Sequence, residues 1–142
     1  MPVQKKAMKE QKIAFFIDDD PTFLALIPDV VQHPRFKIQT YCAVNGYKTI
    51  DEIIKVQPDV LFIDFYLPRA NGGQILPILK SVQALSNLPV YFLTGYSKEE
   101  ILPLLKDTSV KDADYDGVLL KSDSLPEEVL EILNHLDNGV SI

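Results

Sequence analysis

PDVLFIDFYLP, residues Pro58 to Pro68, contains a continuous apolar run that stops abruptly at Asp64. Such a short run between turn-forming residues predicts a strand that is buried on both faces. A carboxylate at the end of that strand is either a turn residue or a reactive group placed at the rim of a sheet. The other strand ends of the chain distinguish between these two interpretations.

Five short strands are predicted in all, because four further runs are apolar or alternate between apolar and polar residues. Together with Val60 to Ile63, they are Ile13 to Ile17, Phe36 to Tyr41, Leu88 to Leu93 and Gly117 to Leu120. The run from Phe36 to Tyr41 alternates, so we expect it at the outside of the sheet.

Five amphipathic helices are predicted between and after these strands. The first runs from Pro21 to about Gln32 with a kink at Pro28, the second ends at Gln57, and a capping box of Ser97 and Glu100 opens the fourth. Ser124 is expected to cap the last helix, and Gly139 to follow its end. The expected inward faces are Tyr47, Ile50, Ile53 and Ile54 in the second helix, Ile75, Ile78, Leu79, Val82 and Leu85 in the third, and Leu125, Val129, Ile132, Leu133 and Leu136 in the last.

Strands that alternate with helices through short connections predict a doubly wound α/β fold with right-handed crossovers. We expect a flavodoxin-like (βα)5 sandwich, whose five-stranded parallel sheet has the strand order 2-1-3-4-5. With 142 residues and 46% hydrophobic content, the chain fits one compact domain. The expected division is a basic leader at 1–12, the domain at 13–137 and a tail at 138–142.

Composition excludes several classes of protein. No apolar run approaches the ~18 residues of a membrane span, and no signal-peptide segment follows the polar start, so we expect a cytoplasmic protein without membrane insertion. Four of the 14 basic residues and one of the 20 acidic residues lie in the first twelve, which leaves a body of net charge −9 and argues against direct nucleic-acid binding. Cys42 is expected to be a small core residue, and His33 and His135 lack partners at the spacing of a zinc site.

Polar residues follow four of the strands, at ends that meet along one edge of a parallel sheet. Crowded carboxylates repel one another unless a divalent cation lies among them. A lysine and a hydroxyl facing that metal would supply donors to a phosphoryl group. The residues are Asp18, Asp19 and Asp20 after the first strand, Asp64 after the third, Thr94 after the fourth and Lys121 after the fifth.

At these residues the chain resembles the receiver domains of bacterial two-component response regulators, and it is similar to the single-domain chemotaxis regulator. The resemblance covers roughly Ile13 to Leu136 and rests on IAFFIDDDP, on PDVLFIDFYLP followed by NGG, on PVYFLTG and on GVLLKS. These motifs are specific jointly and weak one by one.

The resemblance implies a role for each matching residue. Asp64 would accept the phosphoryl group from a histidine kinase, a phosphotransfer protein or a small acyl phosphate, and Thr94 and Lys121 would bind its oxygens. Asp18 and Asp19 would hold Mg²⁺ together with Asp64 and the backbone carbonyl of Tyr66, the residue two places after the acceptor. The protein would then be a signalling switch that catalyses only its own phosphorylation and dephosphorylation.

Two positions depart from the family pattern. Three residues before the lysine the family usually has Tyr or Phe, and this chain has Val118; the residue after the lysine is commonly a cis proline, and this chain has Ser122. Tyr96 is an alternative reporter of movement at Thr94. Tyr66 and Tyr96 flank the acceptor, so two bulky rings are expected to exclude water and prolong the phosphoryl state.

Two other functions are compatible with the sequence. Asp18-Asp19-Asp20-Pro21-Thr22 also fits the D-x-D-x-T signature of haloacid-dehalogenase-like phosphatases, in which Asp18 would be the nucleophile, although the acidic pair expected after the lysine is absent. Val118 and Ser122 favour a receiver-like interaction module that is not phosphorylated.

The expected route for output is a protein surface. Only Asp137 to Ile142 follow the last predicted helix, so we expect an unknown downstream protein or a homodimer to use the face of the fourth helix, the fifth strand and the fifth helix. A receiver domain cut from a longer protein fits equally well.

Overall fold

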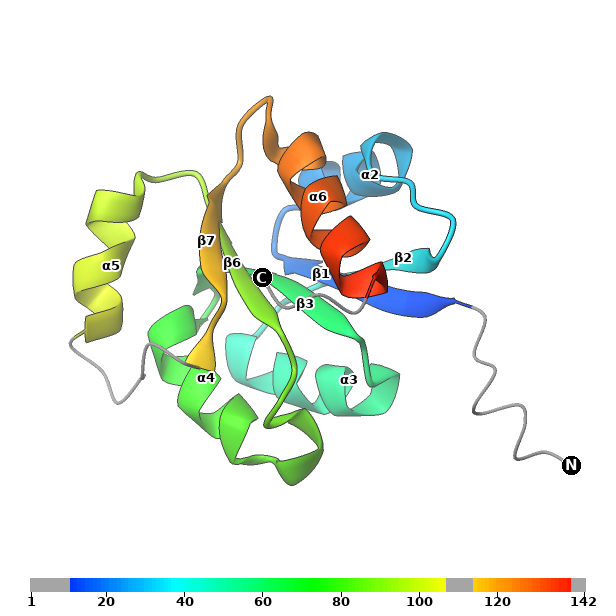
Figure 1. Cartoon of the computed structure of the whole chain (residues 1–142). Coiled ribbons are helices and arrows are strands. Elements are labelled where there is room, and N and C mark those ends of the chain that lie inside the picture. The colour runs from blue at the N-terminus through cyan, green and yellow to red at the C-terminus, as the bar shows by residue number, and fades with distance from the viewer. Residues whose placement is uncertain (1–10, 107–113, 139–142) are drawn as a thin grey trace, which may run out of the picture.

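The computed structural model of the protein describes residues 11–106 and 114–138. Most of the predicted leader, the tail from Gly139 onward and residues 107–113 therefore lie outside the described residues. A five-stranded parallel sheet forms the centre (Figure 1). Its strands are β1 (Lys12–Asp18), β2 (Phe36–Cys42), β3 (Val60–Asp64), β6 (Val90–Thr94) and β7 (Gly117–Leu120). Their order is β2-β1-β3-β6-β7, which confirms the predicted flavodoxin-like order 2-1-3-4-5.

Five helices cover the two faces of the sheet, as the ribbon in Figure 1 shows. Helices α2 (Pro21–Val30) and α6 (Leu125–Asp137) pack on one face. Helices α3 (Thr49–Val56), α4 (Gly72–Ser81) and α5 (Lys98–Lys106) pack on the other. Two 3-10 turns, η1 (Gly46–Lys48) and η2 (Gln83–Leu85), precede α3 and follow α4.

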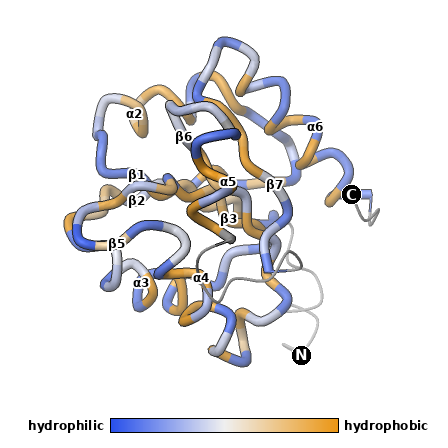
Figure 2. The backbone as a smooth tube through the Cα atoms, turned by 90° about the vertical axis from the view of Figure 1, so that its left-hand side faces the viewer, coloured by the Kyte–Doolittle hydropathy of each residue, from blue (hydrophilic) through white to orange (hydrophobic). Residues whose placement is uncertain are grey.

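The core has two halves because successive residues of a strand point to opposite faces. In β1, Phe15 and Ile17 join the cluster under α3, α4 and α5, whereas Ala14 and Phe16 join the cluster under α2 and α6. The apolar tube segments in Figure 2 follow the same central strands. Full burial of a Phe or Ile side chain stabilises the fold by about 1.5–3 kcal/mol, so these strands anchor the sheet rigidly.

Some predicted inward faces are wrong. Tyr47 is 44% exposed because it lies in η1, before α3 begins, and Ile54 is 39% exposed because it follows the fully buried Ile53 by one residue, about 100° around the helix. Ile78 is 43% exposed on α4. The predicted third helix also ends early, because Val82 lies at the C-cap of α4 and Leu85 belongs to η2.

Helix caps agree only in part with the prediction. The Glu100 carboxylate accepts from the backbone N–H of Ser97 at 3.2 Å, which is one half of the predicted capping box, and it also accepts from the Ser97 hydroxyl. The predicted cap by Ser124 is wrong, because its backbone is helical and its hydroxyl lies 3.0 Å from that of Ser122. A full capping box, which we did not predict, joins Asn71 and Gln74 at the start of α4.

A short antiparallel hairpin, which we did not predict, follows Asp64. Its strands are β4 (Tyr66–Leu67) and β5 (Ala70–Asn71), and Arg69 at the turn has a positive φ of 73°. The backbone N–H of Gly46 donates to the carbonyl of Pro68 at 2.7 Å, which holds the hairpin against η1. The residues after Asp64 are therefore ordered by backbone bonds of their own.

The expectation that Cys42 is a core residue is wrong. Cys42 is exposed, because β2 is the edge strand and has only β1 as a neighbour. Its thiol donates to the backbone carbonyl of Asp19 at 3.7 Å. Within the described part of the chain, no helix is long and apolar enough to cross a membrane.

Candidate functional site

The carboxyl ends of three neighbouring strands bring polar side chains together. Asp18 ends β1, Asp64 ends β3 and Thr94 ends β6, and the side chains of all three are buried. Lys121 follows β7 directly, and its N–H donates to the carbonyl of Thr94 at 2.8 Å. The structure thus gathers the predicted strand-end residues at one edge.

The same local bond fixes each of these three strand ends. The side-chain oxygen of the last residue accepts from the backbone N–H two residues further on, an arrangement typical of Asx turns and their hydroxyl counterparts. The pairs are Asp18 with Asp20 at 3.0 Å, Asp64 with Tyr66 at 3.0 Å, and Thr94 with Tyr96 at 2.9 Å. In both aspartates only Oδ1 is used, so Oδ2 is left for other partners.

Lys121 takes up both of these oxygens. Its Nζ lies 2.6 Å from Oδ2 of Asp18 and 2.8 Å from Oδ2 of Asp64, and 4.7 Å from the ring centroid of Phe23. The Asp64 contact is a hydrogen bond. The Asp18 contact is an ion pair, and among the described residues the buried Oδ2 of Asp18 has no further hydrogen-bond donor.

Three carboxylates form a group that fits a metal ion. Ligand oxygens of Asp18, Asp19 and Asp64 lie within 4.8 Å of one another. When all are ionised, these three groups and the ammonium of Lys121 carry a net charge of −2. Clustered carboxylates, a buried oxygen without a donor and an uncompensated double negative charge suit a divalent cation with oxygen ligands. Asp20 is not in this group, because its side chain accepts from Thr22 N at 3.0 Å and caps α2.

The pKa values reflect this crowding. Burial raises the pKa of Asp64 from 3.8 to about 6, even though the hydrogen bond and charge of Lys121 oppose the rise, and the charge of Asp18 adds to it. Desolvation and the neighbouring Asp18 also raise the pKa of Asp19. Burial alone would lower the pKa of Lys121, but its close contacts with Asp18 and Asp64 raise it. The carboxyls of Asp64 and Asp19 are therefore costly to ionise without an additional cation.

Comparison with known proteins identifies the family of the chain. The family model described as the response regulator receiver domain matches residues 14–133. The chain belongs to this family.

The receiver domain has relatives in bacteria and eukaryotes. It is 27% identical over 100 residues to sporulation initiation phosphotransferase F of Bacillus subtilis (strain 168), a match that covers 70% of the chain and 77% of that protein. It is 23% identical over 121 residues to hybrid signal transduction histidine kinase D of Dictyostelium discoideum, covering 85% of the chain. The chain spans only 8% of that kinase.

Solved structures show the same fold as the receiver domain. The phosphorylated cyanobacterial phytochrome response regulator RcpA superposes with a TM-score of 0.70 at 20% identity, covering 92% of this chain and 97% of that one. Chemotaxis response regulator CheY4 of Vibrio cholerae gives a TM-score of 0.69 at 18% identity, covering 89% and 98% of the two chains.

Both departures of this receiver domain from the family pattern are visible in the structure. Val118 is 6% exposed and belongs to the apolar cluster under α3, α4 and α5. The nearest ring before it in the chain, that of Tyr115, which precedes β7, lies against Phe92, with ring centroids 5.6 Å apart. The peptide bond before Ser122 is trans, like every other described peptide bond.

Two aspartates that we did not single out from the sequence act at the opposite edge of the receiver domain. Oδ2 of Asp59 accepts from Ile13 N at 2.7 Å while Asp59 N donates to Ile13 O, and Asp116 forms the same reciprocal pair with Val90. Each aspartate directly precedes a strand and ties it to the next strand in the sheet. The only available signal was an Asp immediately before an apolar run, which is too common to be specific.

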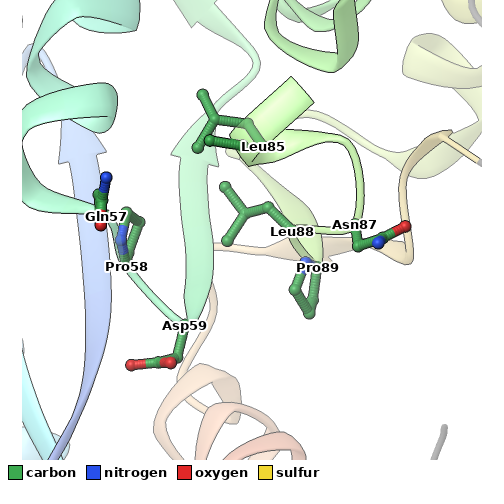
Figure 3. Close-up of a pocket in the computed structure, with 8 residues that line it drawn as sticks. Gln57, Pro58, Asp59, Leu85, Asn87, Leu88 and Pro89 are labelled. Atoms are coloured by element: carbon green, nitrogen blue, oxygen red, sulfur yellow. The ribbon is translucent and has the colours of Figure 1, made fainter. Parts of the chain in front are cut away.

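Two hollows flank the sheet at different ends. One, of about 430 Å³, lies near Asp59 at the amino edge and is lined by the loops at 57–59 and 84–89 (Figure 3). The other, of about 240 Å³, lies between α2 and the start of α6, where Phe23, Leu26 and Leu125 line it and Lys121 closes one end. Only the second hollow adjoins the carboxylate group.

Proposed function

We propose that Asp64 is the phosphoacceptor of this receiver domain. Receiver domains are the phosphorylation-activated switches of two-component systems. The observation that carries the proposal is the position of the Asp64 carboxylate, 2.8 Å from the ammonium of Lys121 and within 4.8 Å of ligand oxygens of Asp18 and Asp19. As a nucleophile, Asp64 would therefore lie beside the fixed positive charge of Lys121 and beside two further carboxylates that could bind a cation.

The reaction that we propose begins with attack of an Asp64 oxygen on the phosphorus of a phosphohistidine or an acyl phosphate. The new O–P bond replaces the bond from phosphorus to the leaving group, which departs with the bonding electrons. Lys121 then pairs with a phosphoryl oxygen, and the Thr94 hydroxyl, whose oxygen already accepts from Tyr96 N, donates its proton to another. Transfer therefore requires only positioning and charge neutralisation from this chain.

Asp18 and Asp19 would hold Mg²⁺ or Mn²⁺ together with Asp64 and the backbone carbonyl of Tyr66. When bound, the ion would neutralise the charge of the carboxylates and of the incoming phosphoryl oxygens. The buried Oδ2 of Asp18 supports this assignment, because a metal would supply the partner that hydrogen bonds within the described residues do not provide.

The partners that we propose follow from this chemistry. A histidine kinase or a phosphotransfer protein would supply the phosphoryl group. The output would leave through the face formed by α5, β7 and α6, to a downstream protein or a second copy of the chain. Support for this surface comes from exposed apolar side chains on α5 and β7, where Leu102, Leu104 and Leu120 are 37–39% exposed.

Intact-mass analysis after incubation with acetyl phosphate and Mg²⁺ tests the proposal. We expect the wild type to gain the mass of one phosphoryl group and Asp64→Asn to gain none. Asp59→Asn, an acid at the other edge of the sheet, is the matched control and should be modified like the wild type. An unmodified wild type would favour the alternative of an interaction module that is not phosphorylated, and label that persists in Asp64→Asn would point to Asp18, the nucleophile of the phosphatase alternative.

A further inference from the structure

Two tyrosine backbones hold the two side chains that would contact the phosphoryl group. The N–H of Tyr66 donates to Oδ1 of Asp64 at 3.0 Å, and the N–H of Tyr96 donates to Oγ1 of Thr94 at 2.9 Å. Asp64 and Thr94 end neighbouring strands, β3 and β6. Each reactive side chain is therefore tied to the tyrosine two residues after it.

The rings of the same two tyrosines are in contact. Their centroids lie 5.4 Å apart with an interplanar angle of 76°, an edge-to-face arrangement that is favourable for aromatic pairs. Neither ring is buried, since Tyr66 is 39% exposed and Tyr96 is 56% exposed. On its inner side Tyr66 also lies edge-to-face on Phe65, at 5.0 Å, and Phe65 is fully buried. Two hydrogen bonds and one ring contact thus connect Asp64 through Tyr66 and Tyr96 to Thr94.

Phosphorylation would act on this path at its first bond. The carboxylate of Asp64 gives Tyr66 N–H a charged acceptor, and hydrogen bonds to charged acceptors are stronger than neutral ones. In an acyl phosphate, whichever oxygen carries the phosphorus, Oδ1 no longer shares a full negative charge. The Tyr66 bond weakens at the moment when the Thr94 hydroxyl is drawn toward a phosphoryl oxygen, so the two tyrosine backbones are displaced together.

Val118 is not placed to transmit a movement of Thr94 to the surface, as far as the described residues show. Val118 has no polar atom beyond its backbone, is buried in the apolar cluster and cannot follow a hydroxyl that moves toward the site. Tyr96, by contrast, is bonded to Thr94 and reaches the surface beside α5.

We propose that the Tyr66–Tyr96 ring pair positions Asp64 and Thr94 relative to each other and transmits the phosphorylation state of Asp64 to the surface at Tyr96. In this proposal the contact between the rings carries the coupling, and the phenol hydroxyls do not contribute to it. Phenylalanine should therefore replace either residue, and an aliphatic side chain should not. This inference rests on the proposed function of Asp64.

Fluorine NMR of the protein labelled with 3-fluorotyrosine tests the proposal. The chain has six tyrosines and no tryptophan, and Tyr→Phe variants assign the signals of Tyr96 and of Tyr47, an exposed tyrosine elsewhere on the surface. Spectra are recorded with Mg²⁺ before and after addition of acetyl phosphate, and intact mass gives the phosphorylated fraction of each sample. We expect the Tyr96 signal to shift in the wild type and in Tyr66→Phe, and the Tyr47 signal to stay unchanged.

Tyr66→Leu is the decisive variant. Compared at equal phosphorylated fraction, its Tyr96 signal should lose the shift that the wild type and Tyr66→Phe show. A Tyr96 signal that still shifts in phosphorylated Tyr66→Leu, or one that does not shift in phosphorylated wild type, overturns the ring pair as the connection and leaves Asp64 as the acceptor. If the wild type gains no phosphoryl mass, the proposed function fails and this inference fails with it.

Discussion

The two edges of the sheet use aspartates in opposite ways. At the amino edge, the carboxylates of Asp59 and Asp116 each accept a backbone N–H of the neighbouring strand. At the carboxyl edge, Asp18, Asp19 and Asp64 lie within 4.8 Å of one another and Asp18 and Asp64 share the single ammonium of Lys121. The residue type is the same, and only the partners differ.

The comparison shows what makes an aspartate structural or reactive. A carboxylate that accepts a backbone N–H has a permanent hydrogen-bond donor within the fold. It therefore contributes to stability and does not need a ligand to satisfy it. Carboxylates that face one another repel, and a cation that binds among them relieves this repulsion. The carboxyl edge is therefore expected to be less stable without a bound cation and to respond more strongly to ion binding. The following predictions test that contrast.

The largest effect is expected for Lys121→Met in metal-free protein. Removal of this lysine leaves the buried carboxylates of Asp18 and Asp64 without their cation, and loss of one partner of a buried ion pair costs about 3–5 kcal/mol of unfolding free energy. Urea unfolding with a chelator present measures the loss. Lys80→Met is the control, because the Lys80 ammonium donates to the backbone carbonyls of Ser86 and Leu88 at the amino edge; equal losses in the two variants would contradict the contrast.

Asp116→Ala should reduce the unfolding free energy by about 1–2 kcal/mol, because it removes the acceptor of the buried Val90 N–H. Asp116→Asn should lose less, since its amide oxygen can accept the same bond. Urea unfolding measures both variants, and intact mass after acetyl phosphate should match the wild type. A phosphorylation defect in Asp116→Ala would show that the two edges are coupled.

A smaller, pH-dependent effect is expected for Asp64→Asn in metal-free protein. Because the pKa of Asp64 is raised from 3.8 to about 6, the native state binds its proton more tightly than the unfolded state, and the stability contributed by this group falls as the pH rises between those two values. Asparagine removes that fall. After allowance for solvent screening, the unfolding free energy of Asp64→Asn relative to wild type should increase by about 1 kcal/mol across this interval.

Urea unfolding at several pH values measures that increase. Saturating Mg²⁺ provides the control, because a bound cation favours the ionised carboxylate and should abolish the increase. A relative stability that stays flat with pH in the presence of chelator would contradict the raised pKa.

The smallest effect is expected for the lifetime of the phosphoryl state. Tyr66→Asn removes one of the two contacting rings that we expect to shield Asp64 from water, so decay of the phosphorylated protein should be about threefold to tenfold faster, equivalent to at most about 1.4 kcal/mol of barrier. The decay is followed by intact mass after acetyl phosphate is removed. Tyr47→Asn, which changes an exposed tyrosine elsewhere, should decay like the wild type, and a wild type that decays as fast as Tyr66→Asn would contradict the shielding.

The sheet could be predicted from the sequence because four of its strands are continuous apolar runs followed by polar residues, and the fifth, β2, alternates between apolar and polar residues. The strands β3 and β7 differ from the prediction by at most one residue, and the convergence of Asp18, Asp64 and Lys121 follows from the parallel topology. What the sequence could not provide was the partner of each oxygen. The contact of Lys121 with both aspartates depends on side-chain geometry that no motif encodes.

Other features were missed for physical reasons that differ from case to case. The hairpin of β4 and β5 has two-residue strands, too short for any periodicity, and its turn places the non-glycine residue Arg69 in the left-handed region. The inward prediction for Tyr47 assumed a continuous helix, whereas Tyr47 lies in the 3-10 turn before α3, and Ile54 lies beside the buried face of α3 that Ile50 and Ile53 form. The prediction for Cys42 rested on residue type alone, although the predicted strand order already put its strand at the outside of the sheet, where a side chain can be exposed.

The exposed thiol of Cys42 makes the protein suitable for site-specific labelling without mutagenesis. It is the single cysteine of the chain, and it lies 3.7 Å from the backbone carbonyl of Asp19. A maleimide-linked fluorophore or spin label attached there would report from the border of the carboxylate group, on a strand that packs against only one neighbour. Ion binding and phosphorylation could then be followed in real time in the native sequence.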